Sequence, residues 1–478
     1  MIKGKTVSGS QTDNTLTLMQ AVPDELINST ERILEYAKIP KEHADLFRTN
    51  LEIFSSLKDK SISNTLTRKV RETITMGFFE IYTSVLNRVW AENNRDKLYQ
   101  LFLTYGYMDE KLMRHEQTNA LYELHDQKPD DIKCSVDNIK DWLGKVYRRE
   151  KDPSVNEFEQ DYYDVFREKK KRGELFDKDK LSYDNNVNAR LKHEVDYLFK
   201  MGQKLCYGKL SEYVPILHNE TVPGPLTRAL VRPAMVEDSL NKVLAVDFSA
   251  FYRETVYHRQ EENKIGTMLI MKSVLPDFIL IPPYGCRAVL WQELSGRSKS
   301  SPGRFILPIF TDENLDNLIT GIVAKFRWGL SRGMSDSVSN RGYESSLFVD
   351  YTDYIQTYRK NRDLSNEAKE KIKKQIDRKR NNMGEIFADD YLTWINYESR
   401  GLPRLNKIAR KILFKYCPFA KSIRESLKEH PLYNQMIAQY DYLASKKATL
   451  LQAQYANMAA ANKAPDAELM ENLKFYQM

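Results

Sequence analysis

The spacing of apolar residues predicts a mainly helical N-terminal half. Seven apolar residues recur at intervals of three and four, which places them on one face of a long helix. They are Leu66, Val70, Ile74, Phe78, Ile81, Val85 and Val89. Shorter amphipathic segments follow around residues 98–102, 142–146 and 191–198. We therefore predict a flexible tail over residues 1–20 and a helical domain, a bundle or an array, over residues 21–208.

The pattern changes near Lys209, where prolines gather and short apolar runs replace the helical stripes. Nine of the seventeen prolines lie between there and Phe310. Runs bounded by Pro and Gly predict strands at residues 243–248, 278–281, 287–291 and 305–309. Tyr284 and Gly285 predict a hairpin-like reversal, and residues 250–262 a helix. Residues 209–310 are thus predicted to be a Pro-rich α+β region.

The helical pattern then returns and predicts a second helical domain over residues 311–461. Its clearest helices are expected at residues 364–397 and 402–416, the second with Pro403 in its first turn. Residues 462–478 are predicted to form a loose tail. The predicted fold class is therefore mainly α, with two helical domains flanking a smaller α+β region.

The composition and the spacing of the cysteines indicate the cellular compartment of the protein. Of the 478 residues, 41% are hydrophobic and 29% are charged, which is typical of a globular chain. No apolar run approaches the roughly 18 residues that cross a bilayer. The four cysteines are scattered, which excludes a local CxxC motif and favours free thiols in a reducing compartment. We expect a cytoplasmic protein without a membrane span.

A basic loop after a predicted strand is a candidate site for an anionic ligand. Residues 287–304 read RAVLWQELSGRSKSSPGR. Glycines allow backbone N–H groups to approach an anion, hydroxyls donate hydrogen bonds, and arginine offers a bidentate fork. The candidate ligand-binding residues are Arg287, Arg297, Lys299 and Arg304. A solvated basic loop is the alternative interpretation, because the order of residues is not that of a Walker A loop.

Acidic residues of the same region could hold a divalent cation. The candidate metal ligands are Asp247, Glu254, Asp277 and Glu293. Their order resembles the core of PD-(D/E)XK nucleases, in which carboxylates of neighbouring strands bind a metal ion. Ser295 stands where that family has its lysine. Isolated acids more often cap helices or pair on surfaces, so both interpretations stay open.

A basic helix in the last third of the chain is a candidate nucleic-acid interface. Arg404, Lys407, Lys411 and Lys415 advance by three, four and four positions and share one face. Such lysines could contact phosphates, and nearby aromatic residues could stack on bases. The alternative is an ordinary solvated helix face. The net charge of +7 permits a nucleic-acid partner without requiring one.

Several phrases resemble a bacterial family of cyclic-nucleotide-binding-domain-containing proteins. They occupy residues 105–110 (YGYMDE), 152–158 (DPSVNEF), 275–278 (LPDF), 350–364 and 398–419, within a similarity that runs from about residue 60 to the end. The resemblance implies a bacterial regulatory setting. The chain lacks the many short strands and the Gly-Glu-rich phosphate cassette of a cyclic-nucleotide β-roll, so the resemblance transfers no site.

These observations lead to a functional hypothesis without an assigned cofactor or catalytic residue. No nucleophile elbow, dinucleotide fingerprint or HExxH zinc motif occurs in the sequence. We expect a cytoplasmic bacterial regulatory or scaffold protein without enzymatic activity, with a protein partner or an anionic or nucleotide ligand. The alternatives are a nucleic-acid-binding protein and a metal-dependent phosphodiesterase or nuclease.

Overall fold

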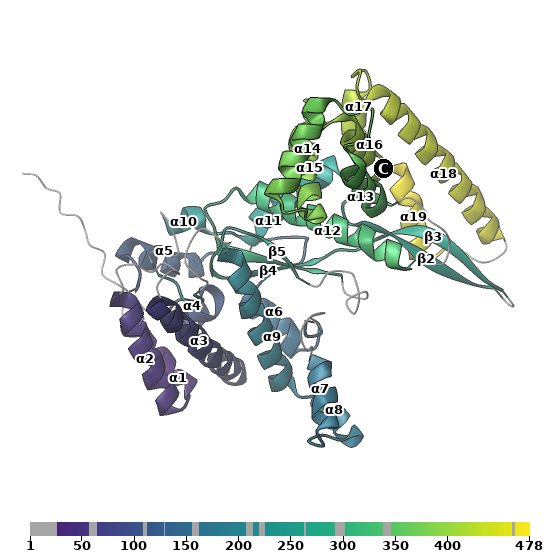
Figure 1. Ribbon diagram of the computed structural model, residues 1–478. Coiled ribbons are helices and arrows are strands. Elements are labelled where there is room, and N and C mark those ends of the chain that lie inside the picture. The colour runs from purple at the N-terminus through teal and green to yellow at the C-terminus, as the bar shows by residue number, and fades with distance from the viewer. Residues whose placement is uncertain are drawn as a thin grey trace, which may run out of the picture.

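The protein is mainly helical, as the sequence predicts, with a small sheet and a two-stranded ribbon (Figure 1). The computed structural model describes residues 26–56, 65–108, 112–128, 130–154, 162–206, 214–218, 225–261, 264–291, 302–337, 346–460 and 464–478. The sheet lies between the N-terminal helices and the C-terminal helices (Figure 1).

The N-terminal helices include one long helix, α3 (Thr65–Glu92). The others are α1 (Ser29–Ala37), α2 (Lys41–Ser56), α4 (Lys97–Tyr105), α5 (His115–His125), α6 (Ile139–Tyr147), α7 (Tyr162–Lys171), α8 (Lys180–Asp184) and α9 (Val187–Gly202), with short 3-10 helices η3 (Asp177–Asp179) and η4 (Gln203–Cys206). Six of the seven residues predicted to share one face of α3 are buried, and Leu66 in its first turn is exposed. The 3.6-residue period thus located this helix correctly.

Four strands form the central sheet in the order β1 (Val136–Asn138), β4 (Asp277–Tyr284), β6 (Arg304–Phe310) and β5 (Val289–Trp291). The first three run parallel, and β5 pairs antiparallel with β6. Every residue of β6 is buried, as expected for a strand covered on both faces. The strands predicted at 278–281 and 305–309 are confirmed, and the one predicted at 287–291 is confirmed over its last three residues.

Three local predictions in this region are wrong. The strand expected at 243–248 is largely the end of helix α11 (Pro233–Val246), which follows the short α10 (Leu226–Ala229). The helix expected at 250–262 is strand β2 (Tyr252–Glu261), which pairs with β3 (Lys264–Ser273). Short apolar runs do not separate helix from strand by period alone, and β2 carries the aromatic and β-branched residues that strands favour. The reversal after Tyr284 forms no β4–β5 hairpin, because both strands pair with β6.

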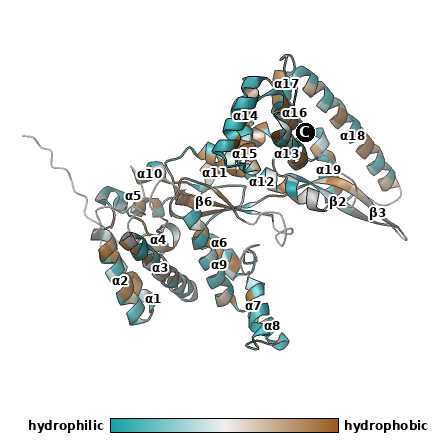
Figure 2. Ribbon diagram, viewed as in Figure 1, coloured by the Kyte–Doolittle hydropathy of each residue, from teal (hydrophilic) through white to brown (hydrophobic). Residues whose placement is uncertain are grey.

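The C-terminal helices begin with α12 (Leu315–Ser337), which packs against α11 and α15. The others are α13 (Leu347–Thr357), α14 (Asn366–Arg378), α15 (Met383–Asn396), the 3-10 helix η6 (Glu398–Arg400), α16 (Lys407–Tyr416), α17 (Lys421–Leu427), α18 (Asn434–Ala460) and α19 (Ala467–Gln477). The charged helix α14 is largely hydrophilic (Figure 2). The expected loose tail contains α19, whose Leu469 and Leu473 are buried.

Two of the predicted C-terminal helices differ from the observed ones. The helix expected at 364–397 is divided into α14 and α15, because Arg380 and Asn381 adopt left-handed backbone conformations that end a helix. The helix expected from residue 402 begins at Lys407, where the Asn406 side chain accepts hydrogen bonds from two backbone N–H groups. Pro403 therefore lies before the helix and not in its first turn.

One hydrophobic core of buried residues reaches from Leu26 to Ile437. It crosses the domain boundaries predicted near residues 208 and 310, and those boundaries stay predictions. A second, smaller core joins Ile270 of β3 to residues of α18 and α19. None of the helices in the described parts of the chain is long and apolar enough to cross a membrane.

A buried carboxyl group links three C-terminal helices and generates a pH prediction. Asp390 of α15 accepts hydrogen bonds from Tyr351 Oη (2.7 Å) and Gln375 Nε2 (3.0 Å). Burial raises the pKa of Asp390 from its usual 3.8 to about 6, despite these two hydrogen bonds. The folded protein therefore holds this proton more tightly than the unfolded chain does. Its contribution to stability is present below about pH 4 and is lost as the pH rises through about 6.

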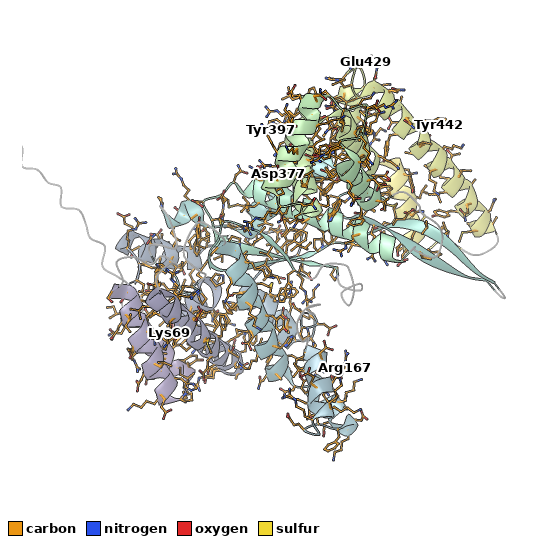
Figure 3. The ribbon with its side chains drawn as sticks, viewed as in Figure 1. Lys69, Arg167, Asp377, Tyr397, Glu429 and Tyr442 are labelled. Atoms are coloured by element: carbon orange, nitrogen blue, oxygen red, sulfur yellow. The ribbon has the colours of Figure 1, made fainter. Side chains whose placement is uncertain are left out.

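We expect the substitution Asp390→Asn to remove this loss, because an amide, like the neutral acid, carries no charge that burial disfavours. The difference in free energy of unfolding between variant and wild type should shift by about 2–3 kcal/mol in favour of the variant between pH 4 and 7. Urea denaturation at several pH values measures it. Asp377→Asn, at an exposed position of α14 (Figure 3), is the matched control and should leave the pH profile unchanged. Parallel profiles for Asp390→Asn and wild type would contradict the assignment.

Candidate functional site

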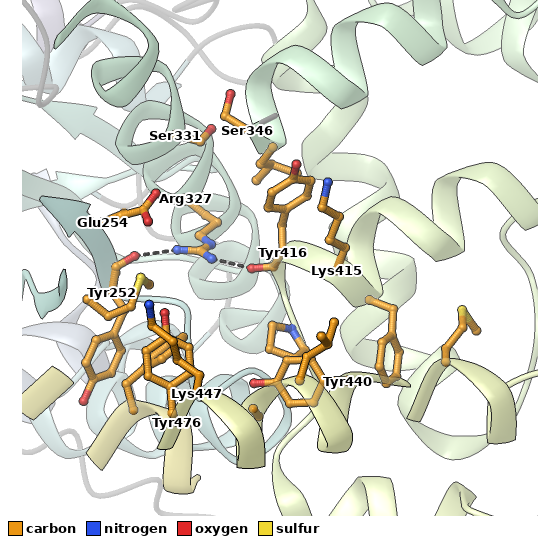
Figure 4. Close-up of a pocket in the computed structure, with 18 of the residues that line it drawn as sticks. Tyr252, Glu254, Arg327, Ser331, Ser346, Lys415, Tyr416, Tyr440, Lys447 and Tyr476 are labelled. Atoms are coloured by element: carbon orange, nitrogen blue, oxygen red, sulfur yellow. Dashed lines mark hydrogen bonds between the residues drawn. The ribbon is translucent and has the colours of Figure 1, made fainter. Parts of the chain in front are cut away.

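A cavity of about 730 Å³ lies between the β2–β3 ribbon and the C-terminal helices (Figure 4). Its walls come from β2, β3, α12, α13, α16, α18 and α19. A volume of this size is typical of sites for small organic ligands. A second pocket among the described residues has a volume of about 390 Å³. We take the larger one as the candidate functional site.

The lining of the cavity is strongly cationic. Five cationic side chains contribute to it, and Glu254 is the single carboxylate among the described lining residues. The cations are Arg253, Arg327, Lys411, Lys415 and Lys447. Charges of one sign in a concave site with apolar walls focus the electrostatic field and attract ligands of opposite charge. The cavity is therefore suited to an anion.

Arg327 of α12 joins two walls of the cavity (Figure 4). Its Nη1 donates to the carbonyl oxygen of Tyr252 at the start of β2 (2.5 Å), and its Nη2 donates to the carbonyl oxygen of Tyr416 at the end of α16. Tyr416 is the last residue of α16, so its carbonyl group has no partner within the helix. The guanidinium group supplies that partner and fixes β2 against α16.

Behind Arg327 lies a buried acidic group that one earlier hypothesis assigned to a metal. Asp247 accepts hydrogen bonds from Ser249 Oγ (2.6 Å) and from Tyr391 Oη (2.7 Å). Burial raises the pKa of Asp247, and the positive charge of Arg327 offsets part of that effect. Asp247 thus acts as a partner of Arg327 and of two hydroxyl groups within the core.

The lysines of α16 differ in their pairing. Lys415 forms an ion pair with Asp350 of α13 (3.0 Å), to which Tyr416 Oη also donates (2.7 Å). Within the described residues, no carboxylate lies at ion-pair distance from Lys411, Lys447 or Arg253. Burial lowers the pKa of Arg253 without a compensating acid. Three of the five cations are therefore available to a ligand.

Aromatic and aliphatic side chains form the rest of the lining. Tyr440 of α18 and Tyr476 of α19 line the cavity (Figure 4). Burial raises the pKa of Tyr476 to about 12, so its hydroxyl group stays neutral and can donate a hydrogen bond at neutral pH. Phe414, Leu330 and Met436 add apolar area. The site thus combines cationic groups with an apolar wall.

The structure describes two of the four residues of the anion site predicted in the basic loop. Arg297 and Lys299 lie outside the described residues. Arg287 is exposed. Arg304 is buried at the start of β6, where it donates to Ser154 Oγ and to the Asp152 carbonyl oxygen (2.8 Å). Its guanidinium carbon also lies 4.6 Å from the ring centre of Trp142. Arg304 is thus held in an internal network.

The predicted metal ligands do not meet in the described structure. No group of three or more His, Cys, Asp or Glu side chains suited to a metal occurs there, so Asp247, Glu254 and Asp277 form none. Asp277 at the start of β4 instead pairs with Lys151 (2.9 Å). Glu254 lies on strand β2 and not on a helix, and Glu293 lies outside the described residues.

The basic helix predicted from the sequence contributes directly to the cavity. Lys411 and Lys415 line it, whereas Lys407 begins α16 as an exposed residue and Arg404 precedes the helix. The guanidinium carbon of Arg404 lies 3.7 Å from the ring centre of Tyr397. Two residues of the predicted basic face thus line the cavity. The nucleic-acid role proposed for this helix stays a prediction.

Sequence reasoning missed the cavity residues of the other elements. Arg253, Arg327 and Lys447 carry no motif and lie far apart in the chain. One signal was present for Arg327, which lies between Phe326 and Trp328 in the largely apolar stretch ITGIVAKFRWGL of α12. A cation within an apolar helix predicts a buried group with specific partners.

Comparison with known proteins adds one finding. Residues 338–476 match the family model of a domain of unknown function (DUF8509). No curated protein and no solved structure matches the chain. The matched segment contains α13 to α18 and nearly all of α19, whereas β2, β3 and α12 precede it. The cavity thus lies between the DUF8509 segment and the residues before it.

We expect Arg327→Met to destabilise the protein strongly. The substitution leaves the carbonyl oxygens of Tyr252 and Tyr416 without their donor and Asp247 without its nearby cation. Loss of one partner from such a buried charged network costs about 3–5 kcal/mol of unfolding free energy. Urea denaturation measures it, with exposed Arg362→Met as the control, expected to stay within about 0.5 kcal/mol of wild type. A loss below about 1 kcal/mol for Arg327→Met would show that the network is dispensable.

Proposed function

We propose that the protein binds a small organic anion in this cavity and acts as a ligand-responsive regulatory protein. The observation that supports this proposal is the charge of the lining, five cations against one carboxylate, with three cations that have no acidic partner among the described residues. A bound anion would supply the missing negative charge. Charge-assisted hydrogen bonds of this kind contribute about 1.5–3 kcal/mol each.

The combination of groups favours binding over chemistry. Lysine and arginine at their usual protonation states hold an anion but do not act as general bases at neutral pH. Aromatic rings such as that of Tyr440 offer an apolar surface to the uncharged part of the ligand. We therefore infer a non-enzymatic, cytoplasmic and bacterial regulatory role. Nucleotides and other organic anions are the first ligands to test.

The double substitution Lys411→Ala with Lys447→Ala should weaken binding of the ligand. These lysines come from two different helices, α16 and α18, and have no acidic partner whose pairing would be disturbed. We expect a loss of about 2 kcal/mol or more in binding free energy, roughly 30-fold in Kd. Isothermal titration calorimetry measures it, after a thermal-shift screen of AMP, ATP, cyclic AMP, alkyl carboxylates and anilinonaphthalene sulfonate.

The control for this experiment removes the same number of positive charges from a surface outside the cavity. Lys360→Ala with Lys374→Ala removes two exposed lysines that do not line the cavity, and the affinity should stay within twofold of wild type. Equal losses in the two double variants would indicate a general charge effect and reject the cavity as the site. A short single-stranded DNA serves as the nucleic-acid arm of the screen. Tight binding of that DNA alone, with a steep salt dependence, would favour the nucleic-acid alternative.

A further inference from the structure

The cavity separates two hydrophobic cores. The large core includes Leu330, Leu347 and Phe414, which line the cavity from the body of the protein. The small core contains Ile270 together with buried residues of α18 and α19, and Tyr476 packs against it. We call β2, β3, residues 448–460 of α18 and helix α19 the C-terminal lobe. The lobe has a core of its own.

Helix α18 crosses from one core to the other over the cavity. Ile437 belongs to the large core, and Ala448 is the next buried residue of the helix. The span between them, residues 438–447, would cover about 15 Å. Within it Tyr440 and Ala444 are half-buried and line the cavity, whereas Tyr442 is exposed on the same helix (Figure 3). Tyr440 packs against the large core, and Leu443, Ala444 and Lys447 line the cavity beside it.

The lobe is tied together by polar contacts of its own. The Asn472 side chain accepts from the backbone N–H of Met271 (2.8 Å), and Tyr257 Oη donates to Asp466 (2.7 Å). Lys272 of β3 also pairs with Glu468 of α19. These contacts join α19 to the ribbon along its length. The lobe can therefore respond to the cavity as a unit.

We propose that the ligand is an amphiphilic organic anion whose apolar part fills the gap between the two cores and thereby orders the C-terminal lobe. This inference rests on the proposed function and adds the ligand class and the consequence of binding. The cations Lys411 and Lys447 bind the anionic group. The apolar side chains of the lining, among them Leu330, Phe414 and Leu443, receive the hydrocarbon part.

The apolar part of the ligand contributes because the gap interrupts the core. The transfer of apolar surface out of water is favourable, and α18 presents such surface to the cavity from exposed Leu443 and half-buried Met436. A nucleotide would place a polar sugar and base edges against these groups. An alkyl chain matches them better, which is why we choose the amphiphile over the nucleotide.

A homologous series of carboxylates tests the ligand class. Octanoate, decanoate and dodecanoate, each below its critical micelle concentration, are titrated into the full chain by calorimetry. Each added methylene should tighten binding about fourfold, so each step of two carbons should tighten it roughly 15-fold. Equal affinities along the series, or tighter binding of AMP than of dodecanoate, would reject the amphiphile and leave the proposed anion site standing. Binding of none of these anions would reject the proposed function itself.

Hydrogen–deuterium exchange tests the coupling. Dodecanoate should slow exchange in residues 448–460, in α19 and in the ribbon, and leave α1 to α3 unchanged. The Lys411→Ala, Lys447→Ala protein should show no such protection at the same ligand concentration. Ligand binding that leaves exchange in the lobe unchanged would reject the coupling but not the site, and so the two failures are distinguishable.

A substitution that fills the cavity should order the C-terminal lobe without a ligand. Ala444→Trp places a large apolar side chain into the cavity, whereas Ala453→Trp, nine positions later and on the opposite, exposed side of α18, does not. Ala444→Trp should slow exchange in the lobe without ligand and weaken dodecanoate binding by at least tenfold. Ala453→Trp should behave as wild type in both measurements. Identical behaviour of the two variants would overturn the proposal that filling the gap orders the lobe.

Discussion

The cavity depends on one buried guanidinium group. Arg327 donates to carbonyl oxygens of Tyr252 and Tyr416, which lie 75 and 89 positions away from it in the sequence. A backbone carbonyl at the end of an element must find a donor or be solvated. By supplying both donors, Arg327 sets the distance between the ribbon and α16. The other walls, α18 and α19, pack against the ribbon and α16 in turn.

Fully buried Glu398 shows how the C-terminal region stabilises a charge inside the protein. Glu398 is fully buried and accepts hydrogen bonds from Arg410 Nε (2.6 Å) and from the backbone N–H groups of Arg404 and Leu405. Burial works against ionisation of Glu398, but these hydrogen bonds hold its pKa below the usual value. The same C-terminal region leaves Arg253, Lys411 and Lys447 without an acidic partner among its described residues. Of these three cations, Arg253 is half-buried, whereas Lys411 and Lys447 are exposed to solvent and can meet a ligand that enters the cavity.

How much of this the sequence could predict depends on the range of the interaction. The α3 face and strands β4 and β6 follow from local period and from apolar runs, and both were located correctly. The exchange of helix and strand around residues 243–262 arose because a short apolar run carries no period, so tertiary pairing with β3 decided the outcome. The cavity could not be predicted from local sequence patterns. Its cations come from β2, α12, α16 and α18, which only the tertiary fold brings together.

Helix α18 shows how a site can nevertheless leave a trace in a sequence. A long helix on a continuous core carries an unbroken apolar stripe. In α18 the stripe continues through Ile437, Tyr440, Ala444 and Ala448, but Tyr440 and Ala444 are only half-buried and line the cavity. An alanine fills little volume, so the helix leaves space beside it where no other side chain of the protein packs. A small residue within the apolar stripe of a long helix is therefore the trace that this hollow leaves in the sequence.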